Sequence, residues 1–387
     1  MIKNILRRLI QLQRVFRFFA FDSLLLIIKA PKKIPRSLLV VQIEGIGDYI
    51  LSRNFFEALQ TSQRFKNYSI TFCGNESCKN MAEAFDSKTV TDFIWIKNDS
   101  FKRYLFYRLA TLKKIRRQGF EVVINPVYSR DSLLEDSVVR AAGAREVIGY
   151  RGDYIHAKRW ERNVFDSYYT ELIDISPAAV FEFYKTKEFF EKILNTAIPL
   201  RKPSLPVLAL DLPIELSNYA VICPGAYVPK RRWYVKNFIQ TADYLHSRYN
   251  ISSVFVGGVQ DKPSPTEQQA MDKRLYITNF IGAIKLPRTV ALIQKSILVV
   301  SNDTGIAHIG AAADVPVVVV SNGNHFGRFT EYPKDVYESI FYAYPSEIAQ
   351  SNLPFQELVD LFDNGSMLDI NSIPVDKIFP LIDRALH

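Results

Sequence analysis

The sequence is poor in cysteine and lacks any long apolar run. Its three cysteines, Cys73, Cys78 and Cys223, include no C-x-x-C pair. So sparse and odd a set argues against a disulfide framework and a structural zinc site, and it is typical of a protein kept in the reducing cytosol. The apolar run at residues 23–28 is far shorter than the roughly 20 residues of a membrane-spanning helix. No small-residue cleavage site follows the N-terminal segment, so the sequence predicts no signal peptide.

Most of the chain has no excess of positive charge, because the net charge is concentrated near the N-terminus. Residues 1–36 hold nine lysines and arginines against the single acid Asp22, a net charge of +8 out of +9 for the whole chain. The remaining residues are nearly balanced, which argues against the basic folded face that nucleic-acid binding requires.

The N-terminal tail, residues 1–36, combines these basic residues with apolar side chains at helical spacing. The apolar positions of this pattern are Ile5, Leu9, Leu12, Phe16 and Phe19. The pattern predicts a basic amphipathic helix that lies in a membrane surface, with its arginines toward anionic headgroups. The alternative is a helix packed on the body of the protein, with solvated arginines.

Beyond the tail, short apolar runs alternate with stretches long enough for helices. The runs lie at residues 37–42, 70–73, 93–96, 122–125 and 147–149, and again at 219–223, 254–256, 297–301 and 316–320. A proline-rich stretch at 199–213 separates the two series. This alternation predicts an α/β fold of two Rossmann-like domains facing a central cleft. We expect a tail at 1–36, an N-terminal domain at 37–200, a C-terminal domain at 214–345 and a helical segment at 346–387.

The segment at residues 44–51 places two glycines and an acid between a strand and a helix. Gly45 and Gly47 would let the backbone approach a substrate closely. Asp48 would lie at the helix start, at the carboxyl end of the first strand, where open parallel sheets bind ligands. An N-cap role for Asp48 is the alternative. The G-x-G-x-x-G spacing of a dinucleotide fingerprint is absent.

A second segment, residues 221–238, runs from a strand through Gly225 into a cationic cluster beside Trp233. The cluster consists of Lys230, Arg231 and Arg232. A guanidinium group can hold a phosphate bidentately and offset the charge of a leaving diphosphate. The alternative is a solvated basic loop, because charged residues are mostly exposed.

The third segment, residues 297–316, has an apolar strand followed by Asp303-Thr304-Gly305 at the start of a helix. A helix start offers unpaired backbone N–H groups that suit a diphosphate, and Gly305 permits close approach of a ligand. Thr304 and His308 are four residues apart and share a face near that start. The alternative is that Asp303 or Thr304 only caps the helix and that His308 is a packed core histidine.

Together the three segments resemble glycosyltransferase family nine, the bacterial lipopolysaccharide heptosyltransferases. The family carries a Gly-Asp turn, a Pro-Gly-Ala strand end followed by Lys-x-Trp, and an Asp-Thr-Gly-x-x-His helix start. The matching residues here are Gly47-Asp48, Pro224-Gly225-Ala226 with Arg231-Arg232-Trp233, and Asp303, Thr304, Gly305 and His308. The resemblance covers about residues 37–345. Arg231 stands at the usual lysine, next to Lys230, and the loop at 321–333 is richer in aromatic and basic residues than the common form, which leaves the donor sugar open.

The resemblance implies an inverting glycosyltransferase of the GT-B type. Such an enzyme would move a sugar such as heptose from a nucleotide-diphosphate donor to a lipopolysaccharide or another cell-surface glycan. Asp48 would be the general base, with Gly45 and Gly47 on the acceptor side. The donor-binding residues would be Gly225, Lys230, Arg231, Asp303, Thr304, Gly305 and His308. No D-x-D triplet occurs in the chain, so we expect no metal, and we expect no other cofactor.

Two other functions are compatible with the same architecture. One is a nucleotide-sugar epimerase, which would need no acceptor. The other is a catalytically silent glycan-binding protein at a membrane surface. With the basic tail, the sequence predicts a cytoplasmic protein that is peripheral on the cytoplasmic face of the inner membrane and has no nucleic-acid partner.

Overall fold

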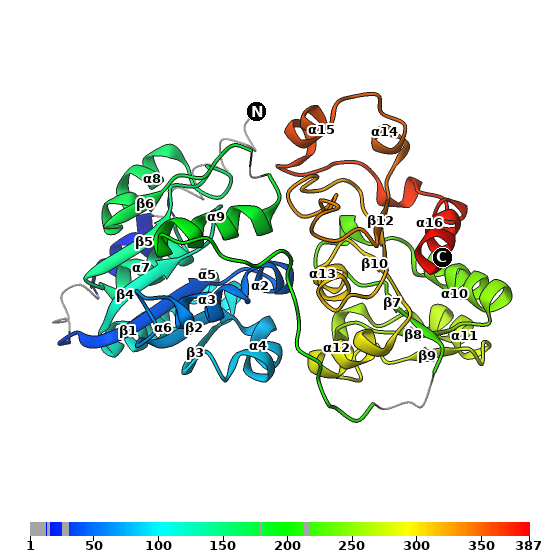
Figure 1. Ribbon diagram of the computed structural model, residues 1–387, viewed down its shortest axis with the longest axis horizontal. Helices are drawn as coiled ribbons and strands as arrows, with labels where there is room; N and C mark the ends of the chain where they lie inside the picture. Colours follow the sequence, from blue (N-terminus) through cyan, green and yellow to red (C-terminus); the bar gives the residue numbers. More distant parts are fainter. Residues whose placement is uncertain (1–12, 14–15, 25–30, 179, 213–216) are drawn as a thin grey trace. The chain divides into compact units, whose positions relative to one another are not determined.

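The chain forms two compact units, each built on its own six-stranded parallel sheet (Figure 1). The computed structural model describes residues 13, 16–24, 31–178, 180–212 and 217–387. Among these, unit 1 holds the residues up to 49, 55–178 and 184–199, and unit 2 holds 50–54, 180–183 and 200–387. The sequence predicts a helix in the tail at residues 1–36. Most of this helix lies outside the described residues, and residues 16–24 are helical.

The sheet of unit 1 has the strand order β3-β2-β1-β4-β5-β6, which is the Rossmann order. Its strands are β1 (Ile34–Gln42), β2 (Ser69–Asn75), β3 (Asp92–Ile96), β4 (Phe120–Asn125), β5 (Glu146–Tyr150) and β6 (Glu171–Ile173). The helices between them are α2 (Ile46–Ser52), α3 (Phe55–Thr61), α4 (Lys79–Asp86), α5 (Asn98–Arg103), α6 (Leu105–Gln118), α7 (Glu135–Ala142) and α8 (Arg159–Phe165), and α9 (Glu182–Leu194) follows β6.

The sheet of unit 2 has the order β12-β11-β10-β7-β8-β9, which is the same arrangement read from the other edge. Its strands are β7 (Tyr219–Cys223), β8 (Ser252–Phe255), β9 (Ile277–Asn279), β10 (Leu298–Asn302), β11 (Val317–Val320) and β12 (Ile340–Ala343). Its helices are α10 (Val235–Tyr249), α11 (Pro265–Asp272), α12 (Leu286–Lys295), α13 (Gly305–Ala312), α14 (Ser346–Ala349), α15 (Phe355–Phe362) and α16 (Phe379–Leu386).

The central strands are apolar on both faces because helices cover both sides of each sheet. In unit 2, Val300 and Val318 point toward the cluster that contains residues of α10 and α16. On the other face, α13 lies close to the sheet, since a Cβ on Gly310 would come within 2.7 Å of a Val317 methyl carbon. Burying a side chain such as valine contributes about 1.5–3 kcal/mol, so these two-sided strands form the core of the unit.

The helix at residues 16–24 packs against unit 1. Phe18 is fully buried, and Asp22 makes a two-pronged ion pair with Arg108, through Nε to Oδ1 at 2.8 Å and Nη2 to Oδ2 at 2.5 Å. Arg140 donates to the Ser23 hydroxyl at 2.6 Å. Residues 16–24 therefore pack on the body of the protein, which was the alternative interpretation of the tail.

The predicted fold class, α/β with two Rossmann-like domains, is confirmed by the two sheets. Each of the nine apolar runs corresponds to a strand, whereas β6, β9 and β12 have no counterpart among them. All three cysteines are free and buried, as expected from their number. In the part of the chain that the structure describes, no helix is long and apolar enough to cross a membrane.

Candidate active site

The second and third predicted segments meet at one point of the sheet of unit 2. β7 and β10 are neighbours, and the chain continues from β7 to β8 on one side and from β10 to β11 on the other. Such a reversal of winding opens a crevice outside the carboxyl ends of the strands, where α/β sheets bind ligands. Residues 224–226 follow β7 and residues 303–305 follow β10, so the fold brings the two segments together there.

Arg231, at the end of a short 3-10 helix (Pro229–Arg231), is held by Asp303. Its Nη2 donates to Asp303 Oδ2 and to the Asp303 main-chain oxygen, both at 2.6 Å. Arg231 Nε is buried and has no hydrogen-bond partner among the described residues. A buried N–H without an acceptor is costly in free energy. This edge of the guanidinium is therefore suited to receive an anionic oxygen from a ligand.

Asn302, the last residue of β10, ties the two segments to each other. Its Nδ2 donates to the Pro224 carbonyl at 2.7 Å, and its Oδ1 accepts from the Trp233 main-chain N–H at 3.1 Å. Trp233 is itself buried and donates through Nε1 to the Ile373 carbonyl at 2.9 Å. Asn302 was not among the predicted site residues, although its place between a strand and the Asp-Thr-Gly turn was a usable signal.

The start of α13 lies in the same crevice. Thr304 is the N-cap, and its Oγ1 accepts from the Ile306 N–H at 3.4 Å. The capping alternative for Thr304 is thus present in the structure. One side-chain cap leaves other first-turn N–H groups of the helix unpaired within it, and the helix dipole adds positive potential at the same end. Capping and anion binding are therefore compatible here.

His308 is buried one turn into α13. Its Nδ1 lies 2.6 Å from the Tyr332 hydroxyl oxygen. Burial, which disfavours the imidazolium form, lowers the pKa of His308 to about 4. The ring is therefore neutral near pH 7 and contributes hydrogen bonding rather than positive charge. Tyr332, in the loop that departs from the common family form, had not been singled out.

The other predicted donor residues are less directly engaged. Lys230 Nζ is exposed and lies 3.6 Å from Met367 Sδ. A Cβ on Gly225 would come within 2.3 Å of Asp261 Cγ, so glycine is needed there for packing against that side chain. Asp261 in turn pairs with Arg232 at 3.3 Å. Within the described part of the chain, Arg231 is the residue of the cationic cluster that hydrogen-bonds to the Asp303 turn.

Asp48 lies in unit 1, in the first turn of α2. Its Oδ2 accepts from the Gly45 main-chain N–H at 3.1 Å, and its main-chain oxygen accepts from Gln42 Nε2 at 3.3 Å. Because α2 begins at Ile46, Gly47 lies inside the helix rather than in the turn before it, which corrects the predicted position of that glycine. The chain between β1 and α2 is thereby fixed at the carboxyl end of β1, beside β4, where the winding of this sheet reverses.

A buried polar network stands at the carboxyl end of β4, and the sequence analysis missed it. Asn125 donates to the Tyr169 hydroxyl, which donates to Asp136 Oδ1, each at 2.7 Å. Arg130 is fully buried, lies 3.1 Å from Asp136 and has its guanidinium carbon 4.3 Å from the centre of the Tyr169 ring. These residues are scattered over more than forty positions without a shared motif. They join the end of β4, the loop after it and α7 to Tyr169, which precedes β6.

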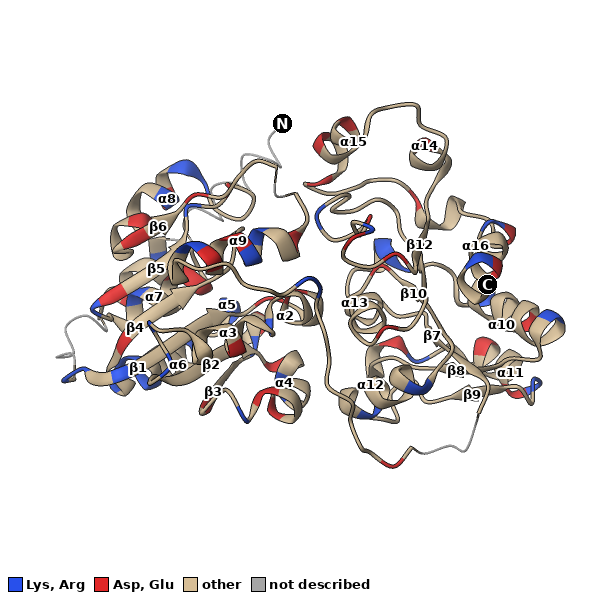
Figure 2. Cartoon of the chain, in the orientation of Figure 1, with Lys and Arg blue, Asp and Glu red and all other residues tan. Residues whose placement is uncertain are grey.

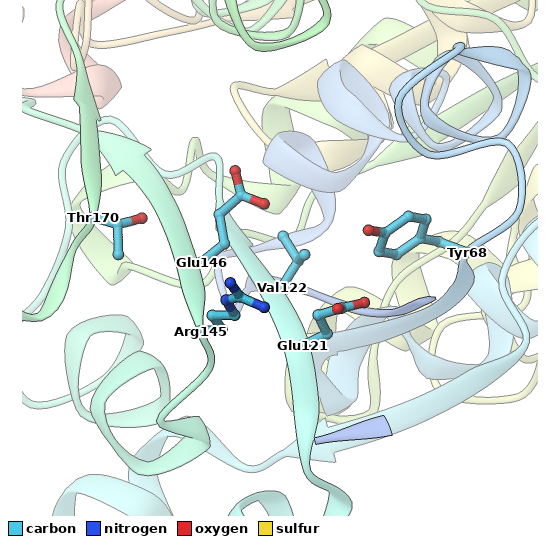
Figure 3. A pocket seen from close by; sticks show the side chains of 6 residues that line it. All are labelled: Tyr68, Glu121, Val122, Arg145, Glu146 and Thr170. Carbon is cyan, nitrogen blue, oxygen red and sulfur yellow. The ribbon is translucent and has the colours of Figure 1, made fainter. Parts of the chain in front are cut away.

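Unit 1 also has an open cavity of about 380 Å³, but at the wrong edge of the sheet for a substrate (Figure 3). It is lined by Tyr68, Glu121, Val122, Arg145, Glu146 and Thr170. Glu121 and Glu146 stand near the amino ends of β4 and β5, whereas ligands of such sheets bind at the carboxyl ends. Among the described residues, no group of three or more histidine, cysteine or acidic side chains is arranged to hold a metal ion.

The fold and these motifs define a glycosyltransferase, and comparison with known proteins identifies the family. The model of glycosyltransferase family 9 (heptosyltransferase) matches residues 108–330, so the chain belongs to that family. The chain is 24% identical over 302 residues to lipooligosaccharide heptosyltransferase 2 of Haemophilus influenzae, and 27% identical over 305 residues to lipopolysaccharide heptosyltransferase 2 of Salmonella typhimurium. Each match covers 73% of this chain and 82% of the relative.

Solved structures agree on the fold. A glycosyl transferase of family 9 from Veillonella parvula superposes with a TM-score of 0.66 at 15% identity, over 92% of this chain and 99% of that one. The Escherichia coli heptosyltransferase WaaC with ADP-2-deoxy-2-fluoro heptose superposes with a TM-score of 0.63 at 15% identity, over 90% and 99%. The resemblance inferred from the motifs and the GT-B fold are both confirmed.

Proposed function

We propose that this chain is an inverting, metal-independent transferase that moves a sugar from a nucleotide-diphosphate donor to a lipopolysaccharide or another cell-surface glycan. Its curated relatives are heptosyltransferases of lipopolysaccharide and lipooligosaccharide, and one solved relative carries an ADP-linked fluoroheptose. ADP-heptose is therefore the donor to test first. The observation that carries the proposal is the unpartnered Arg231 Nε beside the start of α13.

Residues 214–345 would hold the donor. The diphosphate would accept hydrogen bonds from Arg231 Nε and from the first-turn N–H groups of α13 at Thr304 and Gly305. Asp303 fixes the guanidinium, Lys230 adds an exposed positive charge, and the neutral His308 supplies a polar group behind the turn. Gly225 keeps the strand end close to Asp261. Together these groups stabilise the negative charge that develops on the leaving diphosphate.

Residues 37–200 would hold the acceptor, with Asp48 as general base. Asp48 takes the proton of the acceptor hydroxyl, whose oxygen forms a bond to the anomeric carbon of the donor sugar. The bond from that carbon to the diphosphate oxygen breaks on the opposite face, and the diphosphate leaves with the bonding electrons. One displacement inverts the anomeric carbon. Gly45, whose N–H donates to Asp48 Oδ2, lies in the turn on the acceptor side, and Gly47 follows it in the first turn of α2.

Family membership favours this proposal over both alternatives. A nucleotide-sugar epimerase of the same architecture would not match a glycosyltransferase family over residues 108–330. A silent glycan-binding protein would have no need for Asp48 or for the Arg231–Asp303 pair. We further propose that the enzyme works on the cytoplasmic face of the inner membrane and meets that surface through its basic N-terminal part.

The proposal is tested by Asp48→Asn. The variant should keep its fold and its affinity for ADP but lose about 10²–10⁴-fold in turnover, the usual contribution of general base catalysis. Turnover is measured with ADP-heptose and a lipid A-core acceptor, and ADP affinity by calorimetry. Asp376→Asn, the same change at an exposed carboxylate, is the control and should behave like the parent. Near-normal turnover of Asp48→Asn would remove Asp48 from the mechanism.

A further inference from the structure

Three separate segments of unit 1 meet at one small hydrophobic cluster. The helix at residues 16–24 contributes the buried Phe18, the loop before α7 contributes Leu133, the start of α6 contributes Leu105, and α8 contributes Trp160. The Arg108 guanidinium lies over the Phe18 ring, with its central carbon 4.9 Å from the ring centre, and it also binds Asp22. The helix is thus fixed to the body, so side chains on its outer side have a defined neighbourhood.

Large aromatic side chains around this cluster point outward. Phe106 is 87% exposed, and Phe16 and Tyr104 are more than half exposed. Tyr104 and Phe106 flank Leu105 in the chain, and the Phe16 ring stacks on Trp160 with a centroid distance of 5.6 Å. All three exposed rings are therefore immediate neighbours of residues in one cluster. Exposed aromatics gathered in this way mark an interaction surface rather than scattered surface residues.

Arginines stand between these rings. Arg17 and Arg103 lie over the rings of Phe18 and Tyr104, at 5.2 and 5.6 Å. Arg159 precedes Trp160 at the start of α8, and Figure 2 marks basic residues on α6 and α8. In the described part of the chain, none of these three arginines forms an ion pair. Two nearby acids are engaged elsewhere, since Asp22 binds Arg108 and Asp131 binds Lys102.

We infer that this surface of unit 1 docks on an anionic lipid bilayer. This aromatic–basic face consists of Phe16, Arg17, Arg103, Tyr104, Phe106 and Arg159. Phenylalanine and tyrosine rings prefer the depth of the lipid headgroups, and arginines beside them meet the negative surface potential of an anionic leaflet. The inference rests on the membrane partner of the proposed function, and it places the contact on a folded face of the acceptor-side unit rather than on the basic tail alone.

The test compares full-length proteins in co-sedimentation with phosphatidylcholine vesicles that do or do not contain phosphatidylglycerol. Tyr104→Ser/Phe106→Ser should weaken binding at every salt concentration, because apolar insertion does not depend on salt. Arg103→Gln/Arg159→Gln should weaken binding about 10–30-fold at low salt, from the usual contribution of two juxtamembrane basic residues. Leu275→Ser and Arg288→Gln, at exposed positions of unit 2, are the matched controls and should bind like the parent.

Several results would overturn the inference. These are parent-like binding by both double variants, equal binding of the parent to neutral and anionic vesicles, and no binding of the parent at all. Loss of binding on deletion of residues 1–12, with both double variants unaffected, would place the contact in the tail instead. Activity is measured in parallel with a water-soluble acceptor fragment. All variants should keep this activity. Absence of transfer by the parent would contradict the proposed function, whereas the vesicle results alone decide the docking face.

Discussion

At the scale of single residues, the donor half of the site depends on an arginine that is only partly satisfied. Asp303 binds Arg231 through Nη2 and leaves Nε buried without a partner in the described part of the chain. An ion pair that used both edges of the guanidinium would be a purely structural contact. One N–H left without a partner, in an arginine bound to the turn that starts a helix, is the arrangement expected of an anion site.

Arg231→Ala should weaken the binding of ADP by about 10–100-fold, because hydrogen bonds to charged groups contribute roughly 1.5–3 kcal/mol. Arg231→Lys should recover part of this affinity, since an ammonium keeps the charge but not the planar fork. Calorimetric titration with ADP measures both. Arg288→Ala, at an exposed site on α12, is the control. Unchanged ADP affinity in Arg231→Ala would exclude this side chain from the donor site.

At the scale of secondary structure, the strands absent from the prediction share one property, which is that each lies at the edge of a sheet. β6, β9 and β12 are edge strands, and only β3 among the four edges was predicted. Each is three or four residues long, and their residues are partly exposed, as in β9, where none is fully buried. An edge strand buries less of its surface, so its sequence need not be a continuous apolar run.

The helix at residues 16–24 depends on a charge pair that the sequence pattern did not indicate. Arg108 is fully buried, and Asp22, the only acid of the tail, is 5% exposed. The chain around Arg108 is rich in lysine and arginine, and such side chains are mostly exposed, so nothing in the sequence marks Arg108 as buried. A buried arginine without its carboxylate is strongly unfavourable, so this pair decides whether the helix stays on the body.

Asp22→Ala should destabilise unit 1 by up to about 3–5 kcal/mol, or should release the helix so that Arg108 becomes hydrated. Hydrogen exchange of residues 16–24 is measured by mass spectrometry. Either outcome should speed the exchange of these amides, whereas a helix that stays in place should exchange as slowly as in the parent. The double variant Asp22→Leu/Arg108→Met should restore much of the protection, because replacing both members of a buried pair by apolar residues is often neutral. Normal protection in Asp22→Ala alone would show that Phe18 and the Arg140 contacts suffice.

At the scale of the whole molecule, the chain repeats one architecture without repeating its sequence. Both sheets have the Rossmann order, and each has one point where the winding reverses, between β1 and β4 and between β7 and β10. Two such points suit a reaction with two substrates, and the proposed general base and the proposed donor residues are divided between them. In unit 2 we propose that an arginine and a helix start, rather than a metal ion, stabilise the charge of the diphosphate.

The intact enzyme should therefore keep its activity after extended treatment with EDTA and removal of the chelator. A metal-dependent glycosyltransferase carried through the same treatment serves as the control and should lose activity. Transfer is measured as ADP released from ADP-heptose in the presence of acceptor. Activity that disappears with the chelator and returns with a divalent cation would contradict the metal-independent mechanism.

The central strands and the strand-end segments of the candidate site could be predicted from the sequence. Residues such as Val299 and Val300 are buried on both faces of a parallel sheet, so they form apolar runs that are readable without the structure. Because the carboxyl ends of neighbouring parallel strands meet at one edge, the segments around Arg231 and Asp303 could be expected to converge. Local patterns suffice wherever burial or helix geometry imposes a short period on the chain.

Which side chains pair with one another could not be predicted from the sequence and is known from the folded chain. Arg231 and Asp303 are 72 residues apart, Asn302 and Pro224 are 78 apart, and Asp22 and Arg108 are 86 apart. No periodicity links such positions. A polar residue that hydrogen-bonds to a distant partner after folding leaves no pattern in the sequence that identifies that partner. The packing of residues 16–24 on the body could not be predicted for the same reason. A basic amphipathic pattern is common to a helix on a membrane and a helix on a protein surface. The buried Asp22–Arg108 pair shows that this helix lies on the protein surface.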